Sequence, residues 1–273
     1  MLLLVFTLFA ILATLLCFFL DVAWYWLILI FIGSYLITVL LFVITLYIIT
    51  LFYDMKKIVV KPKRFFGATI YHVCVLLKSF LRIKIISEGF EKLEGVKGYA
   101  MVCNHQAIID PIVFLCVSKD KNMSFIMKEE VRKIPLVGRW LTIAGHYYLN
   151  RNNPREGLKT IINGANALKA DRAVGIYVEG TRSKGTKLGE FHEGSFKMPQ
   201  KSKAPIALCV IDNTYKMAKN FPWKRTKVYI KVCEVLSYEN YEAMSTKEIS
   251  DYAYNVMSKG LEELRDKYKY TNL

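Results

Sequence analysis

The first 54 residues of the chain lack lysine and arginine and hold only two acidic residues, Asp21 and Asp54. The rest of the chain carries all 38 basic residues against 21 of the 23 acidic ones, so charge and hydrophobicity separate along the sequence. A cleaved signal peptide would need a basic stretch ahead of its apolar run, and none is present. The apolar segment is therefore expected to stay with the chain as a membrane segment.

The six cysteines include no CxxC pair and show no regular spacing. This pattern predicts neither a zinc site nor a disulfide framework. Four of the cysteines lie in apolar runs, where a free thiol behaves as a small core hydrophobe. We therefore expect reduced thiols, a cytosolic main domain and no metal site.

Several sequence motifs are also missing. There is no Gly-x-Ser-x-Gly elbow for a serine nucleophile and no GxxxxGK[ST] loop for a nucleotide. His192-Glu193 is not followed by a second His three residues later, which excludes the helical zinc-protease motif. Zinc-finger spacing and aromatic RNA-binding signatures are absent, so the basic surplus favours anionic lipid or a phosphorylated substrate over nucleic acid.

Residues 1–53 form an almost purely apolar run, long enough for two helical spans of ~20 residues each. We expect helices over residues 1–20 and about 28–50, turning near Asp21. A single tilted span, or a hairpin that enters the bilayer without crossing it, is also compatible with this run. Basic residues follow immediately, which places the later chain on the cytoplasmic side by the positive-inside tendency (Lys56, Lys57, Lys61, Lys63 and Arg64).

Residues 65–86 mix apolar and basic groups, a pattern that suits a helix in the membrane interface or an ordinary amphipathic core helix. After Gly89, short apolar runs alternate with amphipathic stretches, which predicts an α/β fold. We expect three parts: a membrane hairpin (1–54), a basic interfacial segment (55–88) and a catalytic domain (89–273). Strands are predicted at 99–103, 123–127, 173–178, 206–211 and 227–235, and helices at 111–117, 155–169, 195–200 and 246–268.

His105 and Asp110 lie just beyond the predicted strand 99–103, where open α/β folds place their ligands. Pro111 favours a helix start, which predicts that Asp110 is the N-cap of the next helix. A loop between them would let Asp110 fold back and fix the tautomer of His105, which could then take a proton from a hydroxyl. From these residues alone, the simpler interpretation is an Asp that only caps its helix and a His on the surface.

Two further segments add candidate anion-binding groups. Glu179, Gly180, Thr181 and Arg182 follow the strand predicted at 173–178, and Arg151 follows the run from Gly145. The guanidinium of arginine matches phosphate geometry, although each Arg alone could be a solvated surface charge.

The order of these motifs resembles the lysophosphatidate acyltransferase (1-acylglycerol-3-phosphate O-acyltransferase) family, in its bacterial form. The NHxxxxD block is Asn104, His105 and Asp110, and the second block ends at Arg151. The third block, usually FPEGTRS, reads YVEGTRS from Tyr177, with Val178 in place of the usual Pro. The fourth is the strand around Pro205, where Ala207-Leu208 replaces the usual Val-Pro.

This resemblance implies a central mixed sheet flanked by helices, and acyl transfer from a thioester to a lysophospholipid hydroxyl. It implies His105 as general base and Asp110 as its orienting partner. The substrate-binding residues would be Asn104, Lys128, Arg151, Glu179, Gly180, Thr181 and Arg182. It implies no bound cofactor, since acyl-CoA or acyl-acyl-carrier-protein is a co-substrate, and its partners are membrane lipids, the two substrates and acyl-carrier protein.

Other functions remain open from the sequence. The acceptor could be glycerol-3-phosphate or another lysolipid, or the chain could be a non-catalytic module that binds anionic lipid. A hydrolase would need a protein nucleophile, which the motifs do not supply. Basic and aromatic residues interleaved over 215–227 could form a second membrane contact or an ordinary basic loop.

Overall fold

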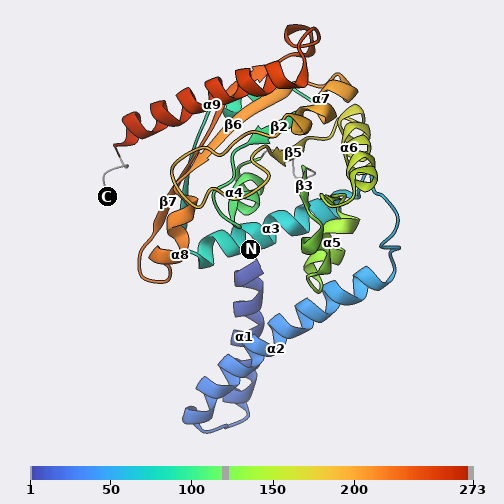
Figure 1. The fold of residues 1–273 in the computed structure, drawn as a ribbon. Coiled ribbons are helices and arrows are strands. Elements are labelled where there is room, and N and C mark those ends of the chain that lie inside the picture. Colours follow the sequence, from blue (N-terminus) through green and yellow to red (C-terminus); the bar gives the residue numbers. More distant parts are fainter. Residues whose placement is uncertain (1, 119–122, 270–273) are drawn as a thin grey trace.

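The computed structural model describes residues 2–118 and 123–269, beginning with a helical hairpin that projects from the rest of the chain (Figure 1). α1 (Leu2–Phe19) and α2 (Trp24–Leu51) turn at Asp21, as predicted, where φ is 56°. The ring of Phe6 packs on Tyr35 and Phe42, with centroids 6.2 and 5.4 Å apart. Outside these ring contacts, the hairpin exposes most of its large apolar side chains.

Of the described helices, α2 alone is long and apolar enough to cross a membrane, judged by length and composition. α1 has 18 residues and so measures about 27 Å, short of the ~30 Å hydrocarbon core. The hairpin is fastened to the main domain near the end of α2. There, Arg139 donates from Nε to Thr50 Oγ1 at 2.8 Å and from Nη2 to Thr50 O at 3.0 Å.

α3 (Arg64–Phe80) lies against the domain and buries Phe66, Ile70 and Cys74 in its core. The prediction of one helix over 65–86 is wrong beyond Phe80, because the chain continues as strand β1 (Ile83–Glu88). Buried Ile83 followed by exposed Lys84 fits a strand with one side on the core and the other toward solvent.

Seven strands form one mixed sheet in the order β1-β7-β6-β2-β5-β3-β4. All neighbours are parallel except β6 and β7. The remaining strands are β2 (Ala100–Cys103), β3 (Ser124–Lys128), β4 (Tyr147–Leu149), β5 (Val174–Tyr177), β6 (Ile206–Asp212) and β7 (Thr226–Leu236). The five predicted strands are confirmed to within one residue at each end, and the two edge strands β1 and β4 were not predicted.

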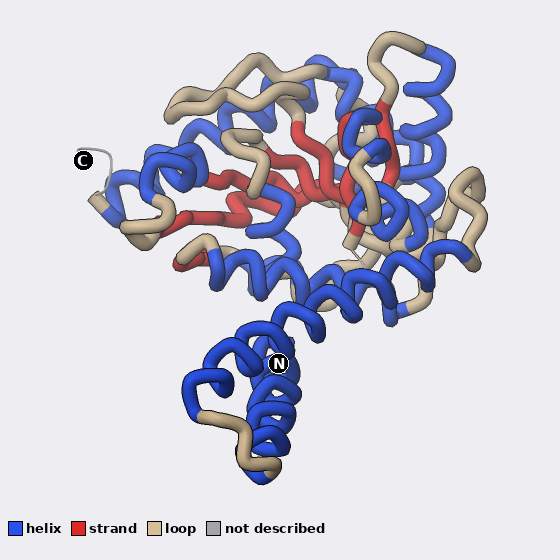
Figure 2. Tube along the Cα trace, turned by 90° about the horizontal axis from the view of Figure 1, so that it is seen from below, coloured by secondary structure: helices blue, strands red, loops and turns tan. Residues whose placement is uncertain are grey.

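Helices cover both faces of the sheet, as Figure 2 shows with the strands in red between blue helices. One core contains residues of α6 (Pro154–Lys169), α7 (Lys197–Ser202) and α9 (Thr246–Tyr268), and the other contains residues of α3, α4 (Asp110–Val117) and α5 (Val137–Ile143). Alternate residues of β2 enter the two cores, so the strand is buried on both sides. The helical prediction at 195–200 corresponds to a 3-10 turn (Glu193–Phe196) followed by α7.

The last two helices of the chain complete the fold. The start of α9 is the predicted capping box, in which Ser245 Oγ accepts from Glu248 N at 3.2 Å and Glu248 Oε2 accepts from Ser245 N at 2.7 Å. The short helix α8 (Met217–Asn220) lies between β6 and β7. β1 joins segment 55–88 to the sheet, and the three-part division of the chain stays a prediction.

Candidate active site

The candidate site lies where the adjacent parallel strands β2 and β5 end. Cys103 and Tyr177 are register partners, so the residues that follow each strand emerge side by side. His105 stands two residues past Cys103, and Glu179 stands two residues past Tyr177. Glu179 Oε1 accepts a hydrogen bond from His105 N at 3.1 Å, which ties the two loops together.

His105 Nδ1 lies 2.7 Å from Asp110 Oδ2, with Asp110 fully buried and His105 19% exposed. The same carboxylate oxygen accepts from the backbone N–H groups of Gln106 at 2.7 Å and Ala107 at 2.9 Å. The loop from 105 to 110 therefore folds around the Asp110 carboxylate. Since a carboxylate only accepts, Nδ1 carries the proton and Nε2 is left with a free lone pair.

The prediction that Asp110 caps α4 is wrong. The N-cap is Ile109, and Asp110 is the first helical residue, with no side-chain bond to the helix. Its carboxylate turns back to the preceding amides because the loop brings two of them within reach. Asp110 therefore orients His105 but does not cap α4.

Glu179 is buried, with 4% of its surface exposed. Burial raises the pKa of its carboxyl above the ordinary 4.5, while hydrogen bonds from the backbone of His105 and Gly189 act in the opposite direction. On the far side of His105, Ser183 donates from N to His105 O at 2.8 Å and from Oγ at 3.3 Å. The loop that follows β5 thus forms hydrogen bonds with both the N–H and the C=O of His105.

Gly180 lies against two basic side chains from distant segments. It has φ of 66°, and a Cβ placed on it would stand 2.7 Å from His192 Cδ2 and 3.2 Å from Arg151 Nη2. Arg151 follows β4, and His192 precedes the 3-10 turn before α7. The absence of a side chain at Gly180 lets both groups gather beside the Glu179 loop. The structure thus brings Arg151 to the site, as predicted, and adds His192, which was not.

The other predicted binding residues are placed differently. Thr181 and Arg182 continue from Gly180 as exposed residues. Lys128 ends β3 with its ammonium 2.8 Å from Glu130, both about three-fifths exposed at 62% and 60%. Asn104 is buried and exchanges two hydrogen bonds with the backbone of Ile211, at 2.8 and 2.9 Å, so its amide links the ends of β2 and β6.

A polar network behind the site was also missed from the sequence. Gln106 donates to Asp212 Oδ1 at 2.7 Å, and Arg265 Nε of α9 lies 2.7 Å from Asp212 Oδ2. Arg265 Nη2 also donates to the backbone oxygen of Thr186, in the loop that follows Glu179. One side chain of the last helix thereby connects the loop beside His105 with the loop beside Gly180. The sequence did contain one sign of this network, because Arg265 lies on the buried side of the amphipathic helix α9.

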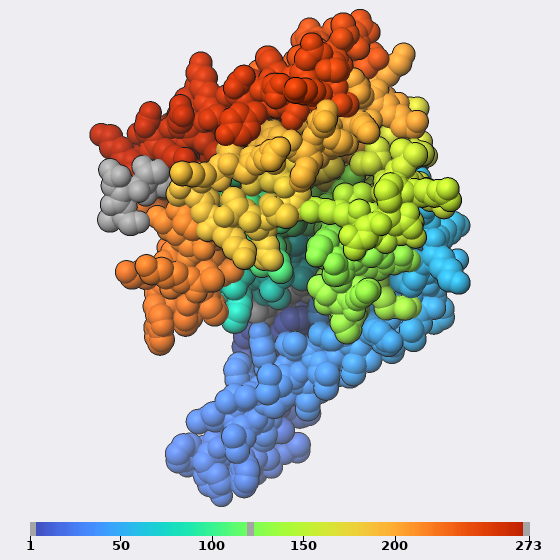
Figure 3. Space-filling model, in the orientation of Figure 1, coloured from blue at the N-terminus to red at the C-terminus, as the bar shows by residue number. Residues whose placement is uncertain are grey.

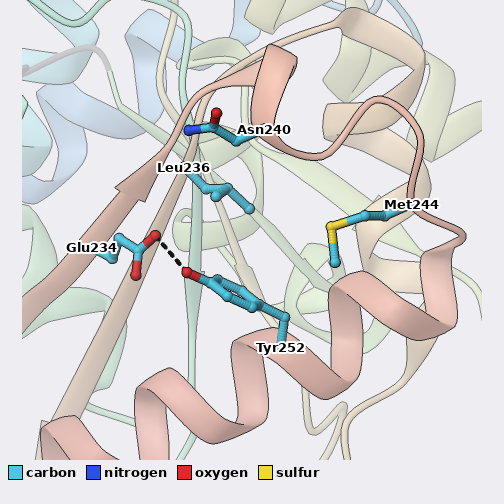
Figure 4. Close-up of a pocket in the computed structure, with 5 residues that line it drawn as sticks. All are labelled: Glu234, Leu236, Asn240, Met244 and Tyr252. Carbon is cyan, nitrogen blue, oxygen red and sulfur yellow. Dashed lines mark hydrogen bonds between the residues drawn. The ribbon is translucent and has the colours of Figure 1, made fainter.

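Two other features lie outside this constellation. His146 is buried and accepts from Phe125 N at 3.1 Å, and burial beside Arg172 lowers its pKa to about 3, so it is a neutral packing residue. A cavity of about 220 Å³ lies between β7 and α9. Tyr252 donates to Glu234 there at 2.8 Å, a bond drawn as a dashed line in Figure 4. None of its lining residues belongs to the site (Glu234, Leu236, Asn240, Met244 and Tyr252).

The model of a family described as Acyltransferase matches residues 84–212, which span β1 to β6 and contain every residue of the predicted site. Over these residues the chain is similar to that family. The acyltransferase blocks that pointed to the resemblance all lie within the matched range, and the resemblance is confirmed.

Three similar proteins illustrate the relationship. A 1-acyl-sn-glycerol-3-phosphate acyltransferase of Saccharomyces cerevisiae is 28% identical over 201 residues, which cover 72% of this chain and 64% of the yeast protein. One from Borreliella burgdorferi is 29% identical over 175 residues, covering 62% and 70%. The crystal structure of the 1-acyl-sn-glycerophosphate (LPA) acyltransferase PlsC from Thermotoga maritima superposes with a TM-score of 0.61 at 24% identity, covering 73% and 79%, and confirms the predicted fold.

Proposed function

We propose that this acyltransferase moves an acyl group from an acyl thioester to the free hydroxyl of 1-acylglycerol-3-phosphate, giving phosphatidic acid. The observation that carries the proposal is the 2.7 Å contact of His105 Nδ1 with the buried Asp110 carboxylate, beyond the carboxyl ends of the parallel strands β2 and β5. The similarity to proteins named 1-acyl-sn-glycerol-3-phosphate acyltransferase supports the choice of acceptor.

In this mechanism, Nε2 of His105 takes the proton of the lysolipid hydroxyl as its oxygen attacks the thioester carbonyl. Asp110 stabilises the imidazolium that results. The tetrahedral intermediate then collapses, the C–S bond breaks, and the departing thiolate takes the proton from His105. No protein atom is acylated, because the substrate supplies the nucleophile.

The acceptor phosphate is assigned to the basic groups beside Gly180. Arg151 lies there in the structure, and the exposed Arg182 follows two residues later. Arginine binds phosphate through two parallel hydrogen bonds, which fixes orientation as well as charge. Glu179 would order the loop that carries Arg182, through its bond to His105 N.

The site is proposed to work at the cytoplasmic face of a membrane. The apolar hairpin of α1 and α2 and the basic residues that follow it support this placement. The donor would be acyl-CoA or acyl-acyl-carrier-protein, and acyl-carrier protein would then be a transient partner. No bound cofactor is needed for this chemistry.

The decisive experiment measures phosphatidate formation by purified protein from lysophosphatidate and each of the two donors. His105→Ala should lower kcat by roughly 10²- to 10⁴-fold, the usual contribution of a general base. His72→Ala, on α3, is the matched control and should retain the wild-type rate. A His105→Ala variant that keeps its activity would overturn the mechanism.

The same assay separates the alternatives. Faster turnover of glycerol-3-phosphate or of a lysolipid without a terminal phosphate would reassign the acceptor. Tight binding to lysophosphatidate with no turnover of either donor would instead indicate a non-catalytic lipid-binding module. A hydroxylamine-sensitive acyl-protein would contradict direct attack by the substrate.

A further inference from the structure

Two aromatic side chains from segments about 140 residues apart meet on the domain surface, and a third lies two residues further along the chain. Phe80 ends α3 and is 67% exposed, and Trp223, between α8 and β7, is 84% exposed. The ring of Phe221 lies 5.4 Å from that of Phe80. Arg82 Nη1 donates to Pro222 O at 3.2 Å and links the two segments. We refer to Phe80, Phe221 and Trp223 as the aromatic patch.

The two segments that carry the patch bear charge of one sign. Residues 63–86 and 213–227 contain no Asp or Glu and carry ten basic residues: Lys63, Arg64, Lys78, Arg82, Lys84, Lys216, Lys219, Lys224, Arg225 and Lys227. Exposed apolar side chains continue along α3 at Leu77, 37% exposed, and Phe65, 54% exposed. Large exposed apolar groups rimmed by basic ones are typical of a surface that binds an anionic, partly apolar partner.

The position of the patch favours a membrane as that partner. Figure 1 shows α8 at the lower edge of the domain, beside α3, on the side from which α1 and α2 project, while α9 runs along the opposite edge. In Figure 3 the segment around α8, coloured orange, lies at the lower part of the domain, toward the blue hairpin. A bilayer that holds the hairpin therefore lies on the patch side of the domain.

We propose that Phe80, Phe221 and Trp223, with the basic residues around them, form a second contact that docks the domain onto an anionic lipid surface. Tryptophan favours the headgroup level, phenylalanine enters the apolar boundary beneath it, and lysine and arginine are drawn to negatively charged leaflets. Contacts through both the hairpin and the patch would fix the tilt of the domain relative to the bilayer. With the hairpin alone in the bilayer, the domain could still rotate relative to the membrane surface. This inference goes beyond acyl transfer, since the chemistry of His105 does not require it.

The test uses the full chain in nanodiscs with 5-fluorotryptophan, which gives one resonance for each of the four tryptophans. Trp223→Phe identifies the resonance of Trp223 without disturbing a buried residue. A lipid carrying gadolinium on its headgroup broadens signals that lie at the membrane surface. Tyr254→Trp, 41% exposed on α9 at the opposite edge, supplies a matched control signal.

We expect strong broadening of the Trp223 signal in discs that contain phosphatidylglycerol and weaker broadening in phosphatidylcholine alone. Lys219→Glu with Lys224→Glu should abolish the difference between the two lipids. Trp223 broadening no greater than that of the α9 control, in both lipids, would overturn the proposal. So would a Trp223 signal that responds to acyl-carrier protein and not to lipid, which would assign the patch to an acidic protein partner.

Discussion

The imidazole of His105 lies flat against the ring of Tyr177, with centroids 4.2 Å apart and planes inclined by 20°. Tyr177 stacks in turn on Phe125, at 5.7 Å and 12°. The catalytic candidate is thus held in its plane by Asp110 at one nitrogen and on its face by an aromatic side chain. Asp110 fixes the tautomer, and Tyr177 limits rotation about the remaining torsion.

Tyr177→Phe should leave kcat near the wild-type value, because the buried Tyr177 hydroxyl has no hydrogen-bond partner among the described residues. Tyr177→Leu removes the stacked ring, an interaction worth ~0.5–1.5 kcal/mol, and should lower kcat by up to roughly tenfold. Steady-state kinetics and thermal unfolding of both variants check this. If Tyr177→Phe lost as much activity as Tyr177→Leu, the hydroxyl and not the ring would be the important group.

Gly180→Ala should weaken binding of lysophosphatidate. The new Cβ would meet the His192 ring at 2.7 Å, and the φ of 66° is unfavourable for alanine, so Arg151 and His192 must move. Backbone strain of this kind costs about 1–3 kcal/mol, which corresponds to a rise in KM of roughly 5- to 150-fold if it falls on the phosphate site.

Gly185→Ala is the control for that substitution. It lies in the same loop, but its Cβ would meet only Ser183 O, at 3.9 Å, and its backbone is not in the left-handed region. We expect its KM to match that of the wild type. Equal effects of the two substitutions would mean that the loop as a whole, and not the basic pair beside Gly180, binds the acceptor.

Arg265→Met should destabilise the fold and lower activity together. The substitution leaves Asp212, 1% exposed, without its 2.7 Å ion pair and frees the backbone of Thr186. Loss of one partner of a buried pair commonly costs about 2–3 kcal/mol or more. Lys259→Met, an exposed position of the same helix, is the control and should unfold at the wild-type temperature. Unchanged stability of Arg265→Met would show that Asp212 is satisfied without α9.

The sequence predicted those helices, strands and turns whose characteristic residues lie within a short stretch of the chain. The strand that ends at Cys103, the helix that starts after Ser245, and the hairpin turn at Asp21 each carry a pattern that a short window contains. β1 was hidden because Ile83 and Lys84 fit the apolar and basic mixture of a helix as well as the alternation of a strand. β4 has three residues, too few for any periodicity.

The site was predicted in part for the same reason. His105 and Asp110 are five residues apart, so a single loop brings them together, and their contact could be inferred from the sequence. His192 and Arg265 reach the site only through the packing of distant segments, which no local spacing encodes. The sequence did not show that Asp110 would leave the start of α4 uncapped, since a helix start and a preceding loop both offer amide donors. Tertiary packing decided between them.

Glu179→Gln should change how stability depends on pH. Burial raises the pKa of Glu179 above 4.5, so between 4.5 and its higher value in the folded chain the native state keeps a proton that the unfolded chain has released. By linkage, the free energy of unfolding then falls as pH rises through this window.

The amide introduced by the substitution does not titrate and can still accept from His105 N. The unfolding temperature of the variant, relative to that of the wild type, should therefore rise as pH rises from 4.5 through the pKa of Glu179 in the folded chain. Glu190→Gln, exposed in the same loop, should show no such trend. A difference that shrinks with rising pH would mean that the ionised Glu179 is stabilised in place, by a basic group of the site, more than burial disfavours it.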